Sequence, residues 1–155
     1  AIRLAGGFVS FDPNIRADLW HDEVELRQCL ERALACADVV KISVEELAFL
    51  TGNAQVHEGL AALMRTCPAR LVLVTQGKEG VTAWQKGALT HYPASPVECI
   101  DTTGAGDAFV AGLLFGLARD GQARLSEVIT LAQRCGALAT TAKGAMTALP
   151  YHHEL

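Results

Sequence analysis

The stretch that decides the fold of this chain is Asp101-Thr102-Thr103-Gly104-Ala105-Gly106-Asp107-Ala108-Phe109. The extended run of residues 97–100 before it predicts a short strand, and the apolar residues 108–118 after it predict a buried helix. Gly104 and Gly106 make the connection tight, because glycine adopts positive φ and lets a ligand approach the backbone closely. The first N–H groups of a helix lack intrahelical acceptors and carry partial positive charge, so this turn is predicted to bind an anion.

Asp107 places a carboxylate at the edge of this predicted anion site. The combination suits phosphoryl transfer, because N–H groups stabilise charge on a moving phosphate while a carboxylate accepts the proton of an acceptor hydroxyl. The run resembles the D-T-x-G-A-G-D signature of the ribokinase (PfkB) sugar kinases. The chain as a whole is most similar to the C-terminal half of the bacterial members that phosphorylate fructose. The resemblance implies Asp107 as the catalytic base and Gly104, Ala105 and Gly106 as the anion hole.

Other interpretations of the same residues were weighed. A glycine turn before a helix is usually only a connection, and the nine-residue run is much more specific than an isolated G-A-G-D. A dinucleotide-binding fingerprint would need glycine at position 109, which is Phe109. A phosphate-binding Walker loop would need Ser or Thr after Gly77-Lys78, and Glu79 follows instead.

Composition narrows the class of protein. The chain has 155 residues, half of them hydrophobic and 19% charged, with a net charge of −4. Such a chain is long enough for one domain with a sizeable core, and it has no basic patch for nucleic acid and no apolar run long enough to span a membrane. The five cysteines are odd in number and widely spaced, which predicts buried free thiols in a reducing cytoplasm.

The pattern of apolar runs predicts an α/β fold. Strands are expected at residues 8–11, 39–42 and 71–75, a hairpin at 81–85 and 88–92, and helices at 21–37, 44–50, 56–64 and 125–141. These elements form a mostly parallel sheet with a small antiparallel hairpin, in one domain over residues 1–155. The family resemblance names this fold ribokinase-like, a relative of the Rossmann fold.

The residues expected at the nucleotide follow the predicted strands, where ligands gather in α/β sheets. Arg16 lies in a stretch that resembles the family's D-x-N-x-R-x-x-L-W and is implied as a phosphate contact. Ser43 and Glu46 have the spacing of a helix capping box, and the resemblance adds that Glu46 orders the metal and phosphate groups through water. The V-T-x-G-x-x-G resemblance places Thr75, Gly77 and Gly80 along the nucleotide, although an ordinary turn is the simpler interpretation.

Two loops resemble a site for a monovalent cation. Residues 139–150 look like the family's C-terminal loop, which packs beside the adenine and, with the loop at Asp101, often wraps a cation. The residues implied as ligands are Asp101, Thr103, Ala139, Ala142 and Gly144. Ala148 stands where some members have a serine ligand, and Gln133 is implied to lie close to the purine.

The expected reaction is ATP-dependent phosphorylation of a sugar, with Mg²⁺ and K⁺ as the implied ions and fructose as the first substrate. An aminoimidazole riboside or ribose-type kinase, or a nucleotide-binding module without catalysis, would carry the same signature. The chain begins without Met inside a helix-like segment, so we expect a piece of a longer protein that lacks the sugar-binding half and is inactive alone. The implied partners are a sugar and ATP, and a homodimer is compatible with the family.

Overall fold

The computed structural model describes residues 2–119 and 124–151. The chain forms two compact units. The first comprises Ala1–Gln76 and Val81–His91, and the second comprises Gly77–Gly80 and Tyr92–Leu155. Each unit contains a cluster of buried apolar residues of its own, the larger one in the first unit.

The first unit is built on a mixed sheet of five strands in the order β1-β2-β3-β4-β5. The strands β1 (Ser10–Phe11), β2 (Val39–Ser43) and β3 (Leu71–Thr75) are parallel, while β4 (Val81–Gln85) is antiparallel to β3. A two-residue turn, in which Lys86 and Gly87 both have positive φ (52° and 82°), leads into β5 (Ala88–Tyr92). The expected mostly parallel sheet with an antiparallel hairpin is therefore confirmed.

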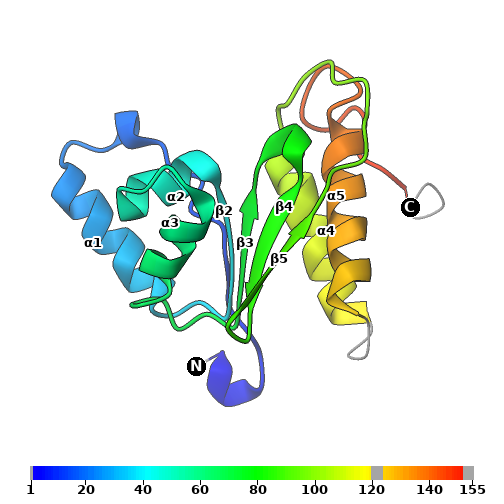
Figure 1. Cartoon of the computed structure of the whole chain (residues 1–155). Helices are drawn as coiled ribbons and strands as arrows, with labels where there is room; N and C mark the ends of the chain where they lie inside the picture. The colour runs from blue at the N-terminus through cyan, green and yellow to red at the C-terminus, as the bar shows by residue number, and fades with distance from the viewer. Residues whose placement is uncertain (1, 120–123, 152–155) are drawn as a thin grey trace. The chain divides into compact units, whose positions relative to one another are not determined.

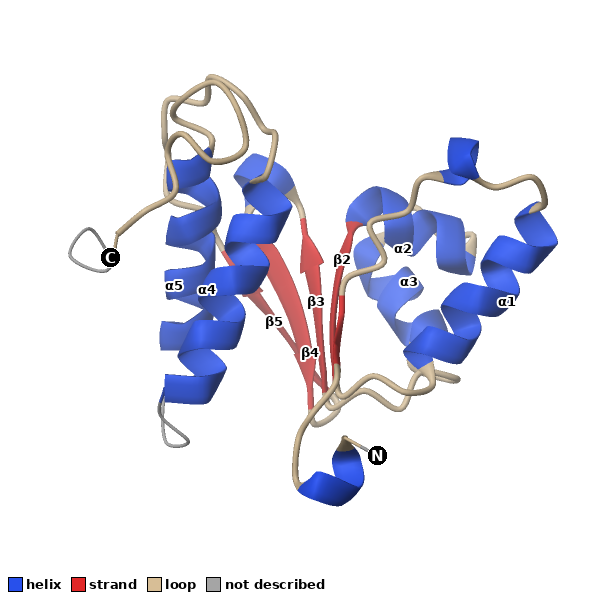
Figure 2. Ribbon diagram, turned by 180° about the vertical axis from the view of Figure 1, so that it is seen from behind, coloured by secondary structure: helices blue, strands red, loops and turns tan. Residues whose placement is uncertain are grey.

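Three helices pack on one face of this sheet (Figure 1; Figure 2 shows the reverse side). They are α1 (Glu23–Leu34), α2 (Val44–Thr51) and α3 (Val56–Leu63). Val40 and Ile42 of β2 point into the core with these helices, so Lys41 between them lies on the opposite face of the sheet. All three helices end earlier than or within one residue of the sequence prediction, and α1 begins after the capping residue Asp22, whose side chain accepts from Val24 N–H at 2.8 Å.

The second unit contains two antiparallel helices, α4 (Ala105–Arg119) and α5 (Leu125–Ala139), which lie side by side in Figures 1 and 2. Glycines set their separation: a Cβ on Gly112 would lie 2.8 Å from Cys135 Sγ, and one on Gly116 would lie 2.9 Å from a Val128 methyl group. The row of small residues on α4 therefore packs directly on α5. The helix was expected to be buried nearly all round, but Phe115 is 45% exposed, so α4 has an open side.

Two predicted strands needed correction. Residues 97–100 form no strand, because the N–H groups of Ile100 and Asp101 both donate to the carbonyl of Thr140 (2.8 and 3.1 Å) at the end of α5. The strand expected over 8–11 is limited to Ser10–Phe11. Its first half bonds to Asp38 instead: Val9 N–H donates to the Asp38 carboxylate at 2.9 Å, and Val9 O accepts from Asp38 N–H at 2.8 Å.

The cysteines are less buried than the sequence suggested. Cys67 and Cys135 are buried, Cys29 is intermediate, and Cys36 and Cys99 are exposed. Burial raises the pKa of the Cys67 and Cys135 thiols above the ordinary value. Across the part of the chain that the structure describes, there is no helix with the length and apolar character needed to cross a membrane.

Candidate functional site

The glycine turn leads directly into α4 in the second unit. Gly104 has φ +81°, in the left-handed region that glycine tolerates, and α4 begins at the next residue, Ala105. Ala105 N–H donates to Thr102 O (3.2 Å), and Ala108 N–H donates to Gly104 O (2.9 Å) as the helix becomes regular. Asp107 lies in the first turn and is exposed. The helix starts earlier than expected, so residues 105–107 are its first turn, where N–H groups lack intrahelical acceptors.

Asp101 joins two loops that are distant in the sequence. Its Oδ1 accepts hydrogen bonds from the N–H (2.9 Å) and the hydroxyl (2.6 Å) of Thr103, and its Oδ2 accepts from Gly144 N–H at 2.9 Å. These bonds favour the charged carboxylate, so the hydrogen bonds from the Thr103 side chain and backbone, followed by that from Gly144, lower the pKa of Asp101. Three of the residues predicted at the cation loops, Asp101, Thr103 and Gly144, therefore lie together.

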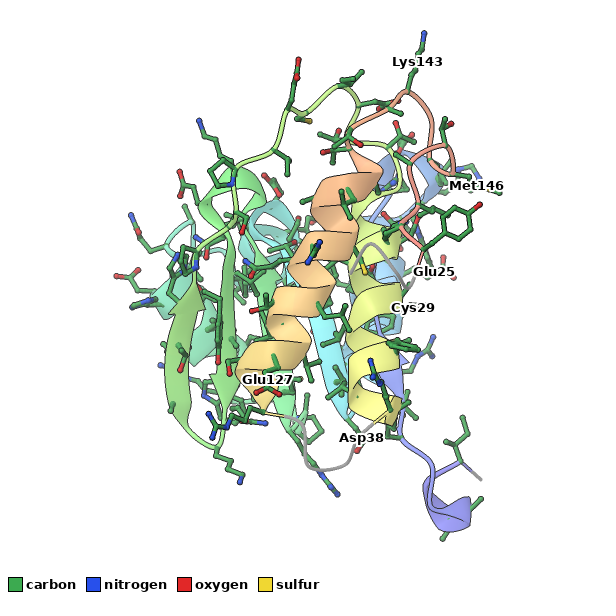
Figure 3. All side chains as sticks on the ribbon, turned by 90° about the vertical axis from the view of Figure 1, so that its right-hand side faces the viewer. Glu25, Cys29, Asp38, Glu127, Lys143 and Met146 are labelled. Carbon is green, nitrogen blue, oxygen red and sulfur yellow. The ribbon has the colours of Figure 1, made fainter. Side chains whose placement is uncertain are left out.

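The loop after α5 lies directly on the glycine turn. A Cβ on Gly104 would lie 2.9 Å from both Cβ and O of Ala145, and Gly144 itself has φ +96°. In Figure 3 the labelled Lys143 points outward from this loop, and Met146 lies on the same loop with 79% of its surface exposed. Of the remaining predicted cation ligands, Ala139 is the last residue of α5 and is buried, and Ala142 is half-buried in the loop. The oxygen-rich set of a carboxylate, a hydroxyl and backbone carbonyls fits a hard cation such as K⁺.

The second glycine turn is also held by close backbone contacts. Residues 77–79 form a 3-10 turn in which Gly80 N–H donates to Gly77 O (3.1 Å). Gly80 has φ +105°, and a Cβ there would lie 2.1 Å from Tyr92 O, so no other residue fits at this position. Gln133 holds the same segment from α5, because its amide nitrogen donates to Tyr92 O at 3.0 Å and to Pro93 O at 3.3 Å. The donor end of the Gln133 amide thus binds the backbone.

In the first unit, polar side chains gather at the carboxyl ends of β1 and β2. Ser43 caps α2, with its hydroxyl accepting from Glu46 N–H at 3.2 Å, and Glu46 Oε2 accepts from Ser43 N–H at 2.8 Å, so the predicted capping box is present. Glu46 Oε1 accepts from Ile15 N–H at 2.7 Å. Arg16 is exposed and its Nη1 donates to Asn14 O (3.3 Å) and Ile15 O (3.2 Å) of its own loop.

Thr75 completes this edge of the sheet. It ends β3 in register with Ser43, and its hydroxyl donates to Ile42 O at 3.3 Å. The predicted residues are thus divided: Arg16, Ser43, Glu46 and Thr75 belong to the first unit, whereas the glycine turns, Gln133 and the cation loops belong to the second. Within each group the structure brings the side chains close to one another.

Sequence reasoning missed one ion pair at this edge. Lys41 Nζ lies 3.3 Å from Asp12 Oδ2, and both residues are largely buried, with side chains 10% and 18% exposed. Burial raises the pKa of Asp12, and the charge of Lys41 opposes that rise. The available signal was a single lysine inside the otherwise apolar strand Val39-Val40-Lys41-Ile42, because a buried lysine needs a partner.

The described residues contain no group of three or more His, Cys, Asp or Glu side chains placed to hold a metal ion. A divalent ion at this site would therefore be bound mainly by its other ligand, as Mg²⁺ is by nucleotide phosphates in many kinases.

Comparison with known proteins followed from this geometry. A model of the pfkB family of carbohydrate kinases matches residues 1–151. The chain is 60% identical to fructokinase from Klebsiella pneumoniae over 159 residues, covering 100% of this chain and 52% of that protein. It is 55% identical to fructokinase from Escherichia coli, again covering 100% of this chain and 52% of the relative. The chain spans about half the length of the curated relatives it matches.

Solved structures give the same neighbours. Fructokinase from Vibrio cholerae O395, in a form with fructose, ADP and calcium ion bound, matches with a TM-score of 0.90 and 46% identity, over 98% of this chain and 50% of that one. Aminoimidazole riboside kinase from Salmonella enterica, complexed with aminoimidazole riboside and an ATP analog, matches with a TM-score of 0.89 and 40% identity, over 97% of this chain and 51% of that one.

Proposed function

The chain belongs to the pfkB family of carbohydrate kinases, and from this premise we propose that the full-length protein transfers the γ-phosphoryl group of ATP to fructose, giving fructose 6-phosphate. The fold is accordingly the ribokinase-like α/β fold of its structural neighbours. One observation carries the proposal: Asp107 lies in the first turn of α4, immediately after the left-handed turn at Gly104, in a chain 60% identical to a fructokinase.

Asp107 acts as the general base in this proposal. Its exposed carboxylate accepts the proton of the primary hydroxyl of the sugar. The sugar oxygen forms a bond to the γ-phosphorus while the bond from that phosphorus to the bridging oxygen breaks, and ADP leaves. The transferred group carries charge on its peripheral oxygens, so most of the catalysis is positioning and electrostatic stabilisation.

The anion hole is formed by N–H groups of the residues 104–107. The N–H of Ala105 already donates to Thr102 O, so the N–H groups of Gly106 and Asp107 are the stronger candidates for phosphate contact. Gly104 keeps the approach open, because its missing Cβ leaves room on the side where Ala145 lies. Arg16 adds a positive charge that suits phosphate recognition.

ATP is proposed to bind with Mg²⁺, which when present neutralises phosphate charge. Glu46 does not fit direct coordination, because both of its oxygens accept backbone N–H groups. Thr75, Gly77 and Gly80 are proposed to lie along the nucleotide, with Ser43 at the edge of that site and Gln133 near the base. The loops at Asp101 and at residues 139–144 are proposed to hold K⁺, with carbonyl and carboxylate oxygens as ligands.

The deciding experiment is a substrate screen with the full-length protein and MgATP. We expect the highest kcat/KM for fructose, with aminoimidazole riboside and ribose at least tenfold lower. Preference for aminoimidazole riboside would favour the second candidate, which rests on the 41% identity to the Salmonella typhimurium enzyme of that name. Nucleotide binding without turnover on any sugar would leave only a binding module.

Three further properties belong to this proposal. The protein is proposed to work in the reducing cytoplasm, which suits the absence of any cysteine pairing requirement in its family chemistry. K⁺ is expected to raise turnover above the rate in Na⁺ at matched ionic strength, and equal rates would count against the cation site. A homodimer is proposed, and light scattering of the full-length protein at several concentrations tests it.

A further inference from the structure

The loop of residues 12–16, here called the β1 loop, is fastened to the sheet and to α2 by charged side chains. At its start, Asp12 pairs with Lys41 of β2, with Lys41 Nζ 3.3 and 3.4 Å from the two carboxylate oxygens. Three residues later, Ile15 N–H donates to Glu46 Oε1 at 2.7 Å across 31 positions of sequence. Between these points Asn14 has φ +44°, a left-handed conformation that costs free energy in a residue other than glycine. The loop is therefore held in a conformation that it would not adopt alone.

Glu46 does more than cap its helix. The capping box requires one carboxylate oxygen to accept the N–H of Ser43, and Oε2 makes that bond at 2.8 Å. Oε1 is directed at Ile15 instead, which lies outside the helix. Hydrogen bonds that a charged group accepts are stronger than neutral ones, so this second bond is a substantial restraint on the loop.

The pair of Lys41 and Asp12 is arranged in the same way. Lys41 is only 8% exposed and sits on the face of β2 opposite the apolar core. Removing two charges from water is costly, and such a pair persists only with good geometry, so it fixes position more than it adds stability. Here the fixed position is the first residue of the β1 loop.

Arg16 depends on this arrangement. Its guanidinium Nη1 donates to the carbonyls of Asn14 and Ile15, at 3.3 and 3.2 Å. The peptide groups that orient Arg16 are thus the ones that Glu46 holds through Ile15. A carboxylate on α2 consequently sets where a cation on the preceding loop is presented.

We propose that Glu46, supported by the ion pair of Lys41 and Asp12, is a positioning residue that clamps the β1 loop so that Arg16 meets the phosphate groups of the nucleotide. The inference rests on the proposed function for its phosphate ligand. It assigns to Glu46 a role through the loop, in place of the metal-ordering role that resemblance alone implies.

The first test is Glu46→Gln in the full-length enzyme. Glutamine has one acceptor oxygen and still completes a capping box, so α2 keeps its cap while Ile15 N–H loses its acceptor. Loss of a charged hydrogen bond and a displacement of the loop on the order of 1 Å should lower kcat/KM for MgATP about 10- to 100-fold. Asp22→Ala is the matched control, because it removes an N-cap bond of α1 (Asp22 Oδ1 to Val24 N–H, 2.8 Å) without touching the β1 loop. Its kcat/KM should stay within about twofold of wild type.

A direct structural readout uses trypsin, which cleaves after Arg16 only when the β1 loop opens. Glu46→Gln should raise the rate of cleavage between Arg16 and Ala17 about tenfold, because locally opened states become more populated. Asp22→Ala should leave that rate unchanged. Equal cleavage rates in wild type and Glu46→Gln would overturn the clamp, whatever the kinase activity.

A double-mutant cycle separates action through Arg16 from independent action. If Glu46 works through Arg16, then Glu46→Gln in an Arg16→Met background should change kcat/KM less than about twofold, because the affected contact is already gone. Full additivity of the two substitutions would overturn the proposal. Lys41→Arg should retain activity while Lys41→Met loses it, and equal loss in both would remove the ion pair from the clamp. An inactive wild type would instead refute the proposed function, and the proteolysis result would still decide the clamp.

Discussion

Asp101 accepts a hydrogen bond of 2.9 Å from the backbone N–H of Gly144, which lies 43 residues later in the chain. The same carboxylate binds Thr103 through two further bonds. One exposed side chain therefore holds together the loop before α4 and the loop after α5, the two loops that flank the turn at Gly104.

Asp101→Asn should loosen both loops. Asparagine keeps one acceptor oxygen and presents an amide NH₂ where the second oxygen was, so either Thr103 or Gly144 loses its partner. We expect faster hydrogen exchange at the Gly144 amide and a smaller effect of K⁺ on turnover. Unchanged exchange at Gly144 would show that the loops are held by other contacts.

The pKa of Asp101 also predicts a dependence of stability on pH. Because hydrogen bonds lower this pKa in the folded state, the carboxylate stabilises the fold fully above the ordinary value of 3.8. That contribution is lost as the pH falls below 3.8 and through the folded-state pKa. Urea unfolding from pH 6 downward should therefore give a steeper loss of unfolding free energy for wild type than for Asp101→Asn. Parallel curves for the two proteins would contradict the assignment.

Asp107→Asn should lower kcat of the full-length enzyme about 100-fold or more, with little change in affinity for ATP, because the base is lost while the N–H groups remain. Glu127→Gln is a matched control, since Glu127 also lies in the first turn of a helix, α5. Steady-state kinetics and ATP titration measure both effects. Turnover near the wild-type value in Asp107→Asn would remove Asp107 from the mechanism.

Gly104→Ala should be more damaging than Gly87→Ala. The two glycines have nearly the same φ, +81° and +82°, so the cost of a left-handed alanine, about 1 kcal/mol, is common to both. Only Gly104 has a neighbour, with Ala145 O and Cβ both 2.9 Å from the added Cβ, whereas Gly87 has nothing within 4 Å. Thermal unfolding and ATP binding should separate the variants. Adding Ala145→Gly to Gly104→Ala should restore only part of the loss, because the carbonyl contact remains.

Cysteine alkylation should follow exposure. Cys99 is exposed, whereas Cys67 and Cys135 are buried, and burial raises the pKa of these two thiols so that less of the reactive thiolate is present. We expect iodoacetamide to modify Cys99 at least tenfold faster, as measured by mass spectrometry of the native protein. Modification of Cys135 at the rate of Cys99 would show that the packing of α5 against Gly112 opens readily.

The chain of 155 residues is expected to show no fructokinase activity by itself. Phosphoryl transfer needs the acceptor hydroxyl within roughly 3–3.5 Å of the phosphorus, and the residues implied to bind the sugar lie outside this chain. Formation of fructose 6-phosphate by the isolated chain, within tenfold of the full-length rate, would place the sugar site in these residues. ATP titration of the same sample shows whether the nucleotide side alone is competent.

Local signals in the sequence predicted local structure well. The spacing of Ser43 and Glu46 predicted a capping box, and both of its hydrogen bonds are present. The small residues Gly112 and Gly116 predicted close helix packing, and they meet α5 as expected. In each case the partners lie within a few residues of each other, or the missing side chain itself is the signal.

Long-range partners were what the sequence did not disclose. Residues 97–100 have strand-like composition, but Thr140 accepts the N–H groups of Ile100 and Asp101, so the segment ends at a helix terminus and pairs with no strand. The bond from Ile15 to Glu46 and the pair of Lys41 and Asp12 span 31 and 29 positions, and nothing in the spacing of these residues indicates them. The signature at 101–107 was informative because it resembles a known family, whereas propensity alone left an ordinary turn as the alternative.

The strand order β1-β2-β3-β4-β5 also has a consequence for synthesis on the ribosome. Each strand pairs with the one made just before it, so no strand of this sheet must wait for a later one. The chain can add strands one at a time as it emerges, and α1, α2 and α3 are made in time to cover the growing sheet. Only α4 and α5, the last helices to be made, complete the turn that carries Asp107. A ribosome stalled after residue 92 would thus hold a folded sheet that has not yet acquired its catalytic base.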